Sequence, residues 1–467
     1  MRNYFLHFSL FIFISFAVFG HDLPLSRIVD DSALRTSVKD TWLIESPGRV
    51  LAKPSVVHTL PGGGRVELRV ESTRNEISVI FARELKNNNG NGITANNAGS
   101  FPGWAQGSWI LTRRRDTGGA ESIKIFLRSD QYTYIKFRPL SQDKCQMDMI
   151  LYNAYIVRNL PLPVNMERLY TMQLNEVLDL AGDKIPRRYF EPRLSDYREK
   201  RQLIAKIREK IKGLEFADDG AIDQSGKYVY IKTGLEQSGK PGLNCSGFAK
   251  WLVDGILQPV TGSRLDIPPL KERFGERGSS FTELWEERDP FFGLDWIRNL
   301  ASQTWSTILA PPFGRLEEIE VRNDTFSQMI LENKNNSVTY FYPGFLENAG
   351  YGVEGLLPLL YTLAIDEPGK FYLAAVNNEM GPPATEDNPK GQPRMRSFFH
   401  IAAFIPYFSE SGAFHVAVFE SAAETSITAF RNRYPLVERM VDGQMKLFPN
   451  GHYVNLVRLP VESVFEP

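Results

Sequence analysis

The sequence predicts an α+β protein of two domains, an all-β domain followed by one that mixes helices and strands. Apolar and polar residues alternate cleanly over residues 65–72, 121–127 and 132–138, which is typical of strands with one buried face. Beyond residue 164 the apolar residues recur at helical spacing, and short apolar strands return only near the C-terminus. This succession of strands and then helices indicates separate β and α+β units.

Length and composition narrow the class of protein. The chain has 467 residues, too many for one ordinary core, with 42% hydrophobic and 23% charged residues, as in globular proteins. A net charge of −1 gives no general attraction to nucleic acid or to an anionic membrane. Only two cysteines are present, which excludes a disulfide scaffold and a cysteine-based zinc module.

The N-terminus has the features of an export signal. Arg2 precedes an apolar run over residues 8–19, and Val18 and Gly20 suit a cleavage site before His21. An uncleaved anchor helix is the alternative, although about 12 apolar residues are short for a span. We therefore expect a signal peptide at residues 1–20 and an exported, periplasmic or secreted protein without a membrane span.

The first domain is expected to be a β-sandwich-like unit over residues 40–158. A low-complexity stretch at residues 87–97 interrupts its strands. Cys145 alternates with polar neighbours in K-C-Q-M-D-M, so it is expected to face the core as a packing residue. The Leu-Pro-Leu-Pro run at residues 160–163 breaks the β pattern and predicts the domain boundary.

The second domain, residues 164–467, begins with helical patterns at residues 166–180 and 196–212. Strands are expected at residues 368–376, 398–408 and 413–420, the last two joined by a turn at 409–412. Between these parts lies a region rich in aromatic residues, which are expected either in the core or along a substrate groove. They are Phe281, Trp285, Phe291, Phe292, Trp296 and Trp305.

Cys245 has the local setting of a nucleophile. It stands at the start of a predicted helix within G-L-N-C-S-G-F-A-K-W-L-V-D, residues 242–254. The positive end of a helix and its free backbone N–H groups favour a thiolate, which lowers a cysteine pKa from about 8.5 to roughly 3.5–7.5.

A cysteine nucleophile needs a base, which is usually histidine. His400 and His415 fall on the two strands of one predicted hairpin. One histidine could therefore reach the thiol while the other orients the imidazole of the first.

The motifs resemble the NlpC-type cell-wall cysteine peptidases, which have a papain-like fold. N-C-S-G-F at Cys245 is similar to the family's D-C-S-G-F, residues 400–404 to H-V-G-I-Y, and residues 412–415 to G-R-F-I-H. The resemblance implies Cys245 as nucleophile, His400 as base and His415 as the residue that orients it. Since H-V-A-V-F at His415 also matches H-V-G-I-Y, the two histidines could exchange roles.

The same resemblance implies a substrate and further site residues. Tyr228 matches the tyrosine that precedes the family's cysteine, and with Ser246 it is expected at the substrate. The expected activity is hydrolysis of a peptide amide, as in peptidoglycan stem peptides, without a cofactor. The long spacing from Cys245 to His400 makes residues 258–367 an insertion, expected as a lid or specificity element.

Other interpretations of these residues remain open. Cys145 and Cys245 could form a disulfide, as cysteines of exported proteins often do. Cys245, His400 and His415 could bind a metal, although a fourth ligand is missing. The protein could also be a non-catalytic envelope binding protein that keeps the fold, or an amidase or acyltransferase with another acceptor.

Overall fold

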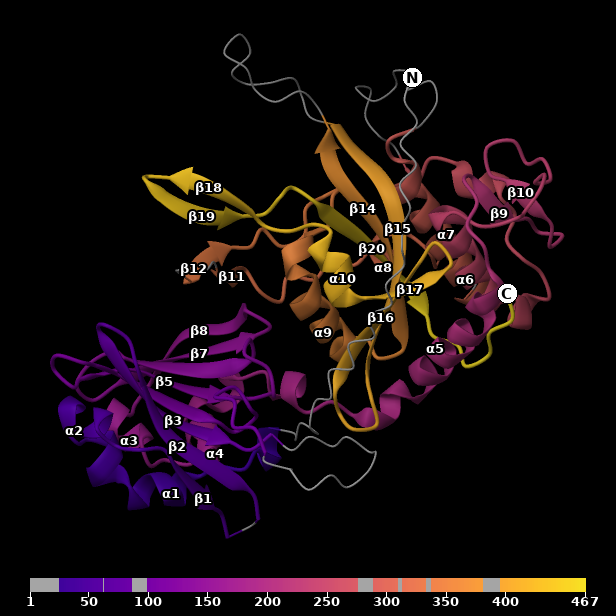
Figure 1. Ribbon diagram of the computed structural model, residues 1–467. Coiled ribbons are helices and arrows are strands. Elements are labelled where there is room, and N and C mark those ends of the chain that lie inside the picture. The colour runs from indigo at the N-terminus through magenta and orange to yellow at the C-terminus, as the bar shows by residue number, and fades with distance from the viewer. Residues whose placement is uncertain are drawn as a thin grey trace.

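The computed structural model describes residues 25–61, 63–85, 99–275, 289–309, 313–332, 337–380 and 395–467. The chain forms two lobes, each built on a large antiparallel sheet (Figure 1). The predicted α+β class is confirmed. The predicted signal peptide, the stretch at residues 87–97, and the aromatic residues Phe281 and Trp285 lie outside the described residues.

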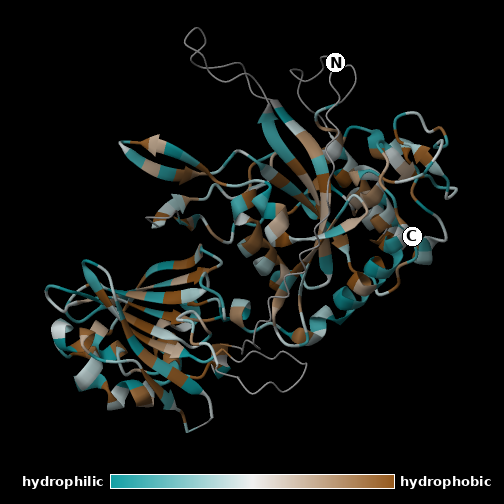
Figure 2. Cartoon of the chain, viewed as in Figure 1, coloured by the Kyte–Doolittle hydropathy of each residue, from teal (hydrophilic) through white to brown (hydrophobic). Residues whose placement is uncertain are grey.

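The N-terminal lobe contains eight strands that pair in chain order as an antiparallel meander. Apolar and polar residues alternate along them (Figure 2), and most of the apolar ones face one core. The strands are β1 (Val56–Thr59), β2 (Arg65–Ser72), β3 (Glu76–Arg83), β4 (Trp109–Arg114), β5 (Ala120–Phe126), β6 (Tyr134–Pro139), β7 (Cys145–Leu151) and β8 (Ala154–Leu162).

A single sheet replaces the expected sandwich. In the described chain, β1–β8 belong to one sheet, and short helices cover its apolar face where a second sheet was expected. These are α1 (Ser32–Ser37), α2 (Pro47–Leu51), α3 (Met166–Leu169) and α4 (Leu174–Ala181). Alternation shows that a strand has one buried face but does not show what covers it, which is why the prediction was wrong here.

The first core extends past the predicted boundary. Residues 160–162 are the end of β8, and the same core continues through Tyr170 and Leu174 to Tyr197. The predicted helix at residues 166–180 is divided into α3 and α4, and the side chain of Asn165 caps α3 by accepting a hydrogen bond from the Arg168 N–H (2.9 Å). The N-terminal lobe therefore includes the first helices that were assigned to the second domain.

The C-terminal lobe is organised around a six-stranded antiparallel sheet of order β13-β20-β14-β15-β16-β17. Its central strands match the three predicted from the sequence. Their bounds are β13 (Tyr351–Gly352), β14 (Lys370–Met380), β15 (Met395–Phe408), β16 (Phe414–Glu420), β17 (Ala423–Ser426) and β20 (Tyr453–Pro460). Two further hairpins are β9 (Gly220–Ile222) with β10 (Tyr228–Tyr230), and β18 (Val437–Val441) with β19 (Gln444–Phe448).

Helices cover both faces of this sheet. Residues of α5 (Arg198–Lys210), α6 (Cys245–Thr261) and α7 (Phe292–Leu309) form one core with alternate residues of β14 and β15. α9 (Leu356–Asp366) and α10 (Ile427–Asn432) join the core on the opposite face. Neighbouring residues of β14 point to opposite faces of the sheet. Phe371 and Leu373 belong to the core that contains α6, and Tyr372 belongs to the core that contains α9.

The segment at residues 258–367 contributes to the cores on both faces of the C-terminal sheet. Its described portion therefore does not form a separate lid. It supplies α7 to one face of the sheet and α9 to the other, together with the short α8 (Leu316–Ile319). It also supplies β11 (Gln328–Glu332) and β12 (Ser337–Phe341), which extend the sheet of the N-terminal lobe through the pairing of Met329 with Ala154.

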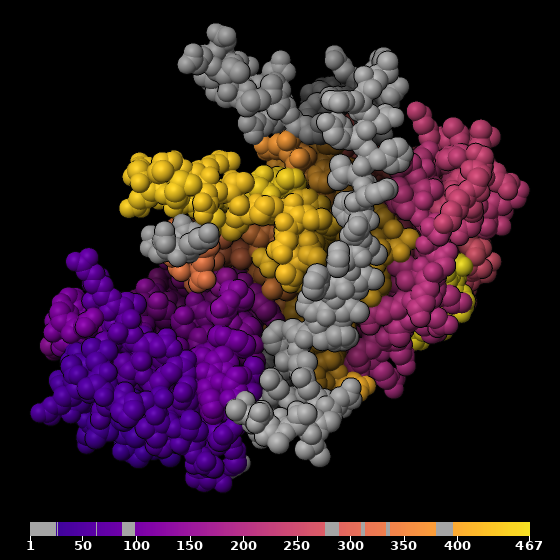
Figure 3. Space-filling model, viewed as in Figure 1, coloured from indigo at the N-terminus to yellow at the C-terminus, as the bar shows by residue number. Residues whose placement is uncertain are grey.

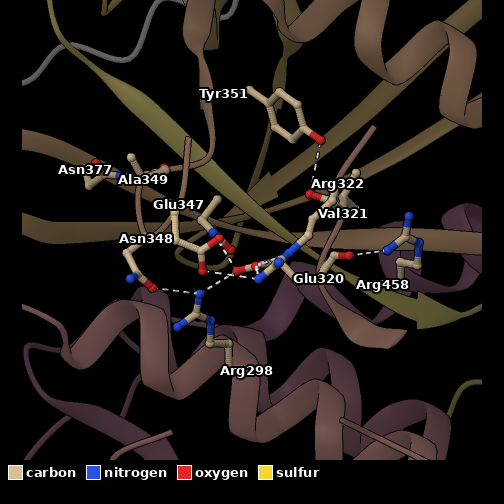
Figure 4. Close-up of polar contacts among 11 residues, drawn as sticks. Arg298, Glu320, Val321, Arg322, Glu347, Asn348, Ala349, Tyr351, Asn377 and Arg458 are labelled. Carbon is tan, nitrogen blue, oxygen red and sulfur yellow. Dashed lines mark hydrogen bonds and ion pairs between the residues drawn. The ribbon is translucent and has the colours of Figure 1, made fainter. Parts of the chain in front are cut away.

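A buried charge network ties this segment to the sheet (Figure 4). Glu320 is fully buried, and its carboxylate accepts hydrogen bonds from Arg298 of α7, from Arg322 (2.8 Å) and from Asn455 of β20 (2.9 Å). Arg458 of β20 donates to the backbone carbonyl of Glu320 and pairs with Glu367 (2.8 Å). Elements far apart in sequence are thus joined by one buried carboxylate.

The two lobes adjoin each other (Figures 1 and 3), and aromatic side chains pack where they meet. Tyr361 of α9 is fully buried and donates its hydroxyl hydrogen to the carbonyl of Tyr189 (2.6 Å). Its ring also packs against Tyr152, whose centroid is 5.5 Å away, and against Phe414 at 4.9 Å. Among the described helices, none is both long and apolar enough to cross a membrane.

Candidate active site

Cys245 is the first residue of α6, as predicted, and Asn244 caps the helix. The Asn244 side-chain oxygen accepts a hydrogen bond from the backbone N–H of Gly247 (2.8 Å). Asparagine and aspartate are equally good caps, so Asn244 serves at the position where the resembled motif has aspartate. Cys245 as a whole residue is partly exposed, although the thiol itself is largely desolvated.

Gly247 lets the start of α6 approach the β9–β10 hairpin. A Cβ atom at this position would overlap the backbone carbonyl oxygen of Gly220 on β9. In the same contact the Asn244 N–H donates to that carbonyl (3.0 Å). The glycine of the C-S-G-F motif is therefore required by backbone packing that fixes the position of Cys245.

His400 lies on β15 beside a β-bulge and faces Cys245. Val376 of β14 pairs with His400 and Asn377 with Phe398, so Phe399 is an extra residue on β15. Bulges re-aim the neighbouring side chains and are common next to active sites. The His400 imidazole interacts with the Cys245 thiol both as a hydrogen-bond partner and as a charge. Its side chain remains 20% exposed, enough to meet a substrate.

Glu420, the last residue of β16, completes the arrangement. His400 Nε2 lies 2.7 Å from Glu420 Oε2, so Nδ1 is the ring nitrogen left for the thiol. Arg433 donates to both oxygens of Glu420, at 2.6 and 2.8 Å. Cys245, His400 and Glu420 thus form a chain of thiol, imidazole and carboxylate, which has the groups that a nucleophile, a base and an orienting residue require.

The charges of these groups reinforce one another. Burial raises the pKa of the Cys245 thiol, but the hydrogen bond and charge of His400 outweigh it and hold that pKa below its ordinary value. Burial lowers the pKa of His400, whereas its contacts with Cys245 and Glu420 raise it to about 9. Burial raises the pKa of Glu420, yet His400 and Arg433 keep it below its usual value. These interactions favour the thiolate of Cys245, the imidazolium of His400 and the carboxylate of Glu420.

Backbone N–H groups around Cys245 could hold a negatively charged oxygen. The N–H groups of Cys245 and Ser246 are in the first helical turn, where no intrahelical acceptor is available. The Ile401 N–H, on the strand that carries His400, hydrogen-bonds the Cys245 sulfur. Donors therefore converge on the nucleophile from α6 and from β15.

His415 lies elsewhere, which corrects its predicted role. It pairs with Tyr407 near the hairpin turn, and its ring stacks on that tyrosine with centroids 5.4 Å apart. The same register places Glu420 opposite Ala402, two residues from His400. The predicted turn at residues 409–412 would place Ser421 opposite His400, so the predicted register did not single out Glu420. The resemblance directed attention to His415 instead.

Ser246 contacts the Cys245 thiol, whereas Tyr228 is placed only in the surrounding core. Ser246 is buried, its hydroxyl hydrogen-bonds the Cys245 thiol, and its carbonyl accepts a hydrogen bond from the Trp296 indole N–H (2.9 Å). It supports the nucleophile, and little of it is exposed to a substrate. Tyr228 lies in β10, where it packs against the same core as Cys245.

The alternatives for the two cysteines can be compared directly. Both are free thiols, so no disulfide joins them. Cys145 is fully buried in β7, as predicted, and burial raises the pKa of its thiol to about 11. Among the described residues, no group of three or more His, Cys, Asp or Glu side chains is arranged to hold a metal ion. His415 lies apart from Cys245 and His400, so the considered metal site is not assembled.

The comparison with protein families gave a match in the N-terminal lobe. Residues 24–189 are similar to a family described as a domain of unknown function (DUF8515). The match ends before Cys245, His400 and Glu420. Comparison with curated proteins and with solved structures gave no match.

Proposed function

We propose that this protein is an exported thiol hydrolase with a papain-like catalytic lobe, and that Cys245, His400 and Glu420 are its catalytic residues. The observation that carries the proposal is the chain of contacts from the Cys245 thiol through His400 to Glu420. A depressed thiol pKa combined with a specific charged partner is characteristic of a functional cysteine.

The proposed reaction is acyl transfer to water. The Cys245 thiolate attacks the amide carbonyl carbon, and the N–H groups of Cys245 and Ser246 stabilise the resulting oxyanion, at about 2.7–4 kcal/mol per donor. His400 gives its proton to the leaving amine as the C–N bond breaks, which leaves a thioester. The neutral imidazole then takes a proton from water, whose hydroxide attacks the thioester and releases the acid and the thiolate.

The substrate class rests on the resemblance to the NlpC-type peptidases. It favours a peptide amide in a peptidoglycan stem, and the signal-like N-terminus favours action outside the cytoplasmic membrane. Glu420 takes the place that the resemblance gave to His415, with the same role of orienting and charging the base.

Replacing Cys245 by Ala is expected to abolish hydrolysis of purified peptidoglycan while leaving the folded structure intact. The matched control is Cys145→Ala, which removes the other thiol and should keep activity, because Cys145 is a packing residue in the other lobe. Product release is measured by mass spectrometry, and folding by circular dichroism. Activity that survives in Cys245→Ala would overturn the nucleophile assignment.

A thiol-reactive probe separates an enzyme from a non-catalytic envelope binding protein. At pH 6, wild-type Cys245 should react with iodoacetamide much faster than an ordinary cysteine, because the thiolate is the reacting form. Slow labelling with ordinary pH dependence would favour the binding protein.

A further inference from the structure

Two lysines lie side by side on the outer face of the N-terminal sheet, away from the proposed active site. Lys124 of β5 and Lys136 of β6 are directly opposite each other in the antiparallel register. Opposite residues have Cβ atoms about 4.5–5.5 Å apart, and like charges at such positions destabilise the sheet. The pair therefore costs folding free energy unless something compensates its charge.

Neither ammonium group has a carboxylate within ion-pair distance among the residues that the structure describes. Asp148 is opposite Lys136 on β7, but its carboxylate pairs with Arg138 (2.7 Å) and accepts the Asn159 N–H (2.7 Å). The other carboxylates that act on the two lysines, from Glu76, Glu121 and Glu332, do so only at longer range. The nearest carboxylate, that of Asp148, is thus already paired with Arg138, and the other carboxylates are too far from the two lysines for an ion pair.

Both lysines are partly withdrawn from water. The Lys124 ammonium lies 4.1 Å from the centre of the Tyr134 ring and 5.8 Å from that of Phe126, which belong to a small apolar cluster on this face. Burial, and next the charge of Lys136, lower the pKa of Lys124 to about 8. Burial is also the main cause that lowers the pKa of Lys136, followed by Arg138. A partly desolvated ammonium group that has no direct ion-pair partner can form strong, charge-assisted hydrogen bonds with an anion.

We propose that Lys124 and Lys136 form a binding site for an oxyanion, a phosphate or a carboxylate carried by a ligand of the N-terminal lobe. The paired ammonium groups contact the oxyanion, and the rings of Tyr134 and Phe126 hold the Lys124 side chain in place. The site is independent of the proposed hydrolase activity, since it includes none of the residues around Cys245.

Anion binding to these lysines is tested by thermal unfolding in sodium phosphate and in sodium glucuronate, with ionic strength held constant by chloride. The wild-type melting temperature is expected to rise with at least one of the two anions, because a ligand of the folded state stabilises it. A rise in melting temperature in phosphate alone, in glucuronate alone or in both would identify which oxyanion the site prefers.

The variants Lys124→Met and Lys136→Met keep the apolar stem and remove one charge. Each is expected to lose the anion-dependent rise and, in chloride alone, to melt at the wild-type temperature or above it, because repulsion is relieved. The control Lys144→Met, at an exposed position of the same lobe, should behave as wild type. The proposal fails if neither anion stabilises the wild type, if the rise persists in both variants, or if both melt below wild type in chloride.

Discussion

At the scale of single residues, the pKa of the Cys245 thiol depends on charged side chains from elsewhere in the chain. Burial alone would make this thiol a weak acid, as it does for Cys145. The difference is the His400 imidazolium, which Glu420 stabilises and which Arg433 supports by fixing Glu420. Glu420 is therefore expected to control the thiolate without touching it.

Replacing Glu420 by Gln keeps a hydrogen-bond acceptor for His400 and removes the negative charge. The pKa of His400 should fall, and the pKa of Cys245 should rise toward its ordinary value, because the imidazolium that stabilises the thiolate is itself less stable. A rise of about one unit lowers the thiolate fraction at acidic pH about tenfold. The pH profile of iodoacetamide labelling measures this shift.

The control for this substitution is Glu424→Gln. Glu424 lies on the neighbouring β17 and pairs with Arg208 (2.7 Å), so its loss should leave the labelling profile unchanged. Labelling profiles that coincide for Glu420→Gln and wild type would mean that His400 does not depend on Glu420.

At the scale of elements, the position of Cys245 is set by how closely α6 approaches β9. The backbone contact at Gly220 leaves no room for a side chain at Gly247. The register of β15 with β16 in turn determines which residue reaches His400. Packing of a helix start on a hairpin and pairing of two strands thus bring three distant residues together.

Gly247→Ala is expected to destabilise the protein by roughly 1–3 kcal/mol or more, since its Cβ would push α6 away from β9. Labelling of Cys245 should slow as well, because the thiol moves relative to His400. Gly213→Ala is the matched control, because a Cβ there meets no atom within 4 Å and its stability should change by less than about 1 kcal/mol. Urea denaturation measures the free energy of unfolding of the two variants. An equal loss of stability in both would contradict the close packing of α6 on β9.

At the scale of the whole molecule, the C-terminal lobe is held together by contacts between segments far apart in sequence. Glu320 links α7, the segment that leads to β11, and β20, while Tyr361 links the lobes. These contacts make residues 258–367 part of the architecture that supports the site, where the sequence pattern predicted an insertion.

Replacing Glu320 by Gln should cost about 3–5 kcal/mol, because Arg298 would keep a buried charge without its partner. The comparison is Glu347→Gln, whose side chain is 59% exposed and pairs with Arg322 at 3.2 Å. A surface pair of that kind contributes about 0–1 kcal/mol. Chemical denaturation of both variants gives the difference, and a similar loss in each would argue against a buried network.

The sequence alone determined the local features of this protein. The helix start at Cys245, the three late strands and the core position of Cys145 all follow from periodicity and capping, which act between near neighbours. Only the tertiary structure decided that helices cover the first sheet and that Glu420, in place of His415, hydrogen-bonds His400. Those outcomes depend on strand register and on contacts between segments that are 20 to more than 100 residues apart, which local patterns do not encode.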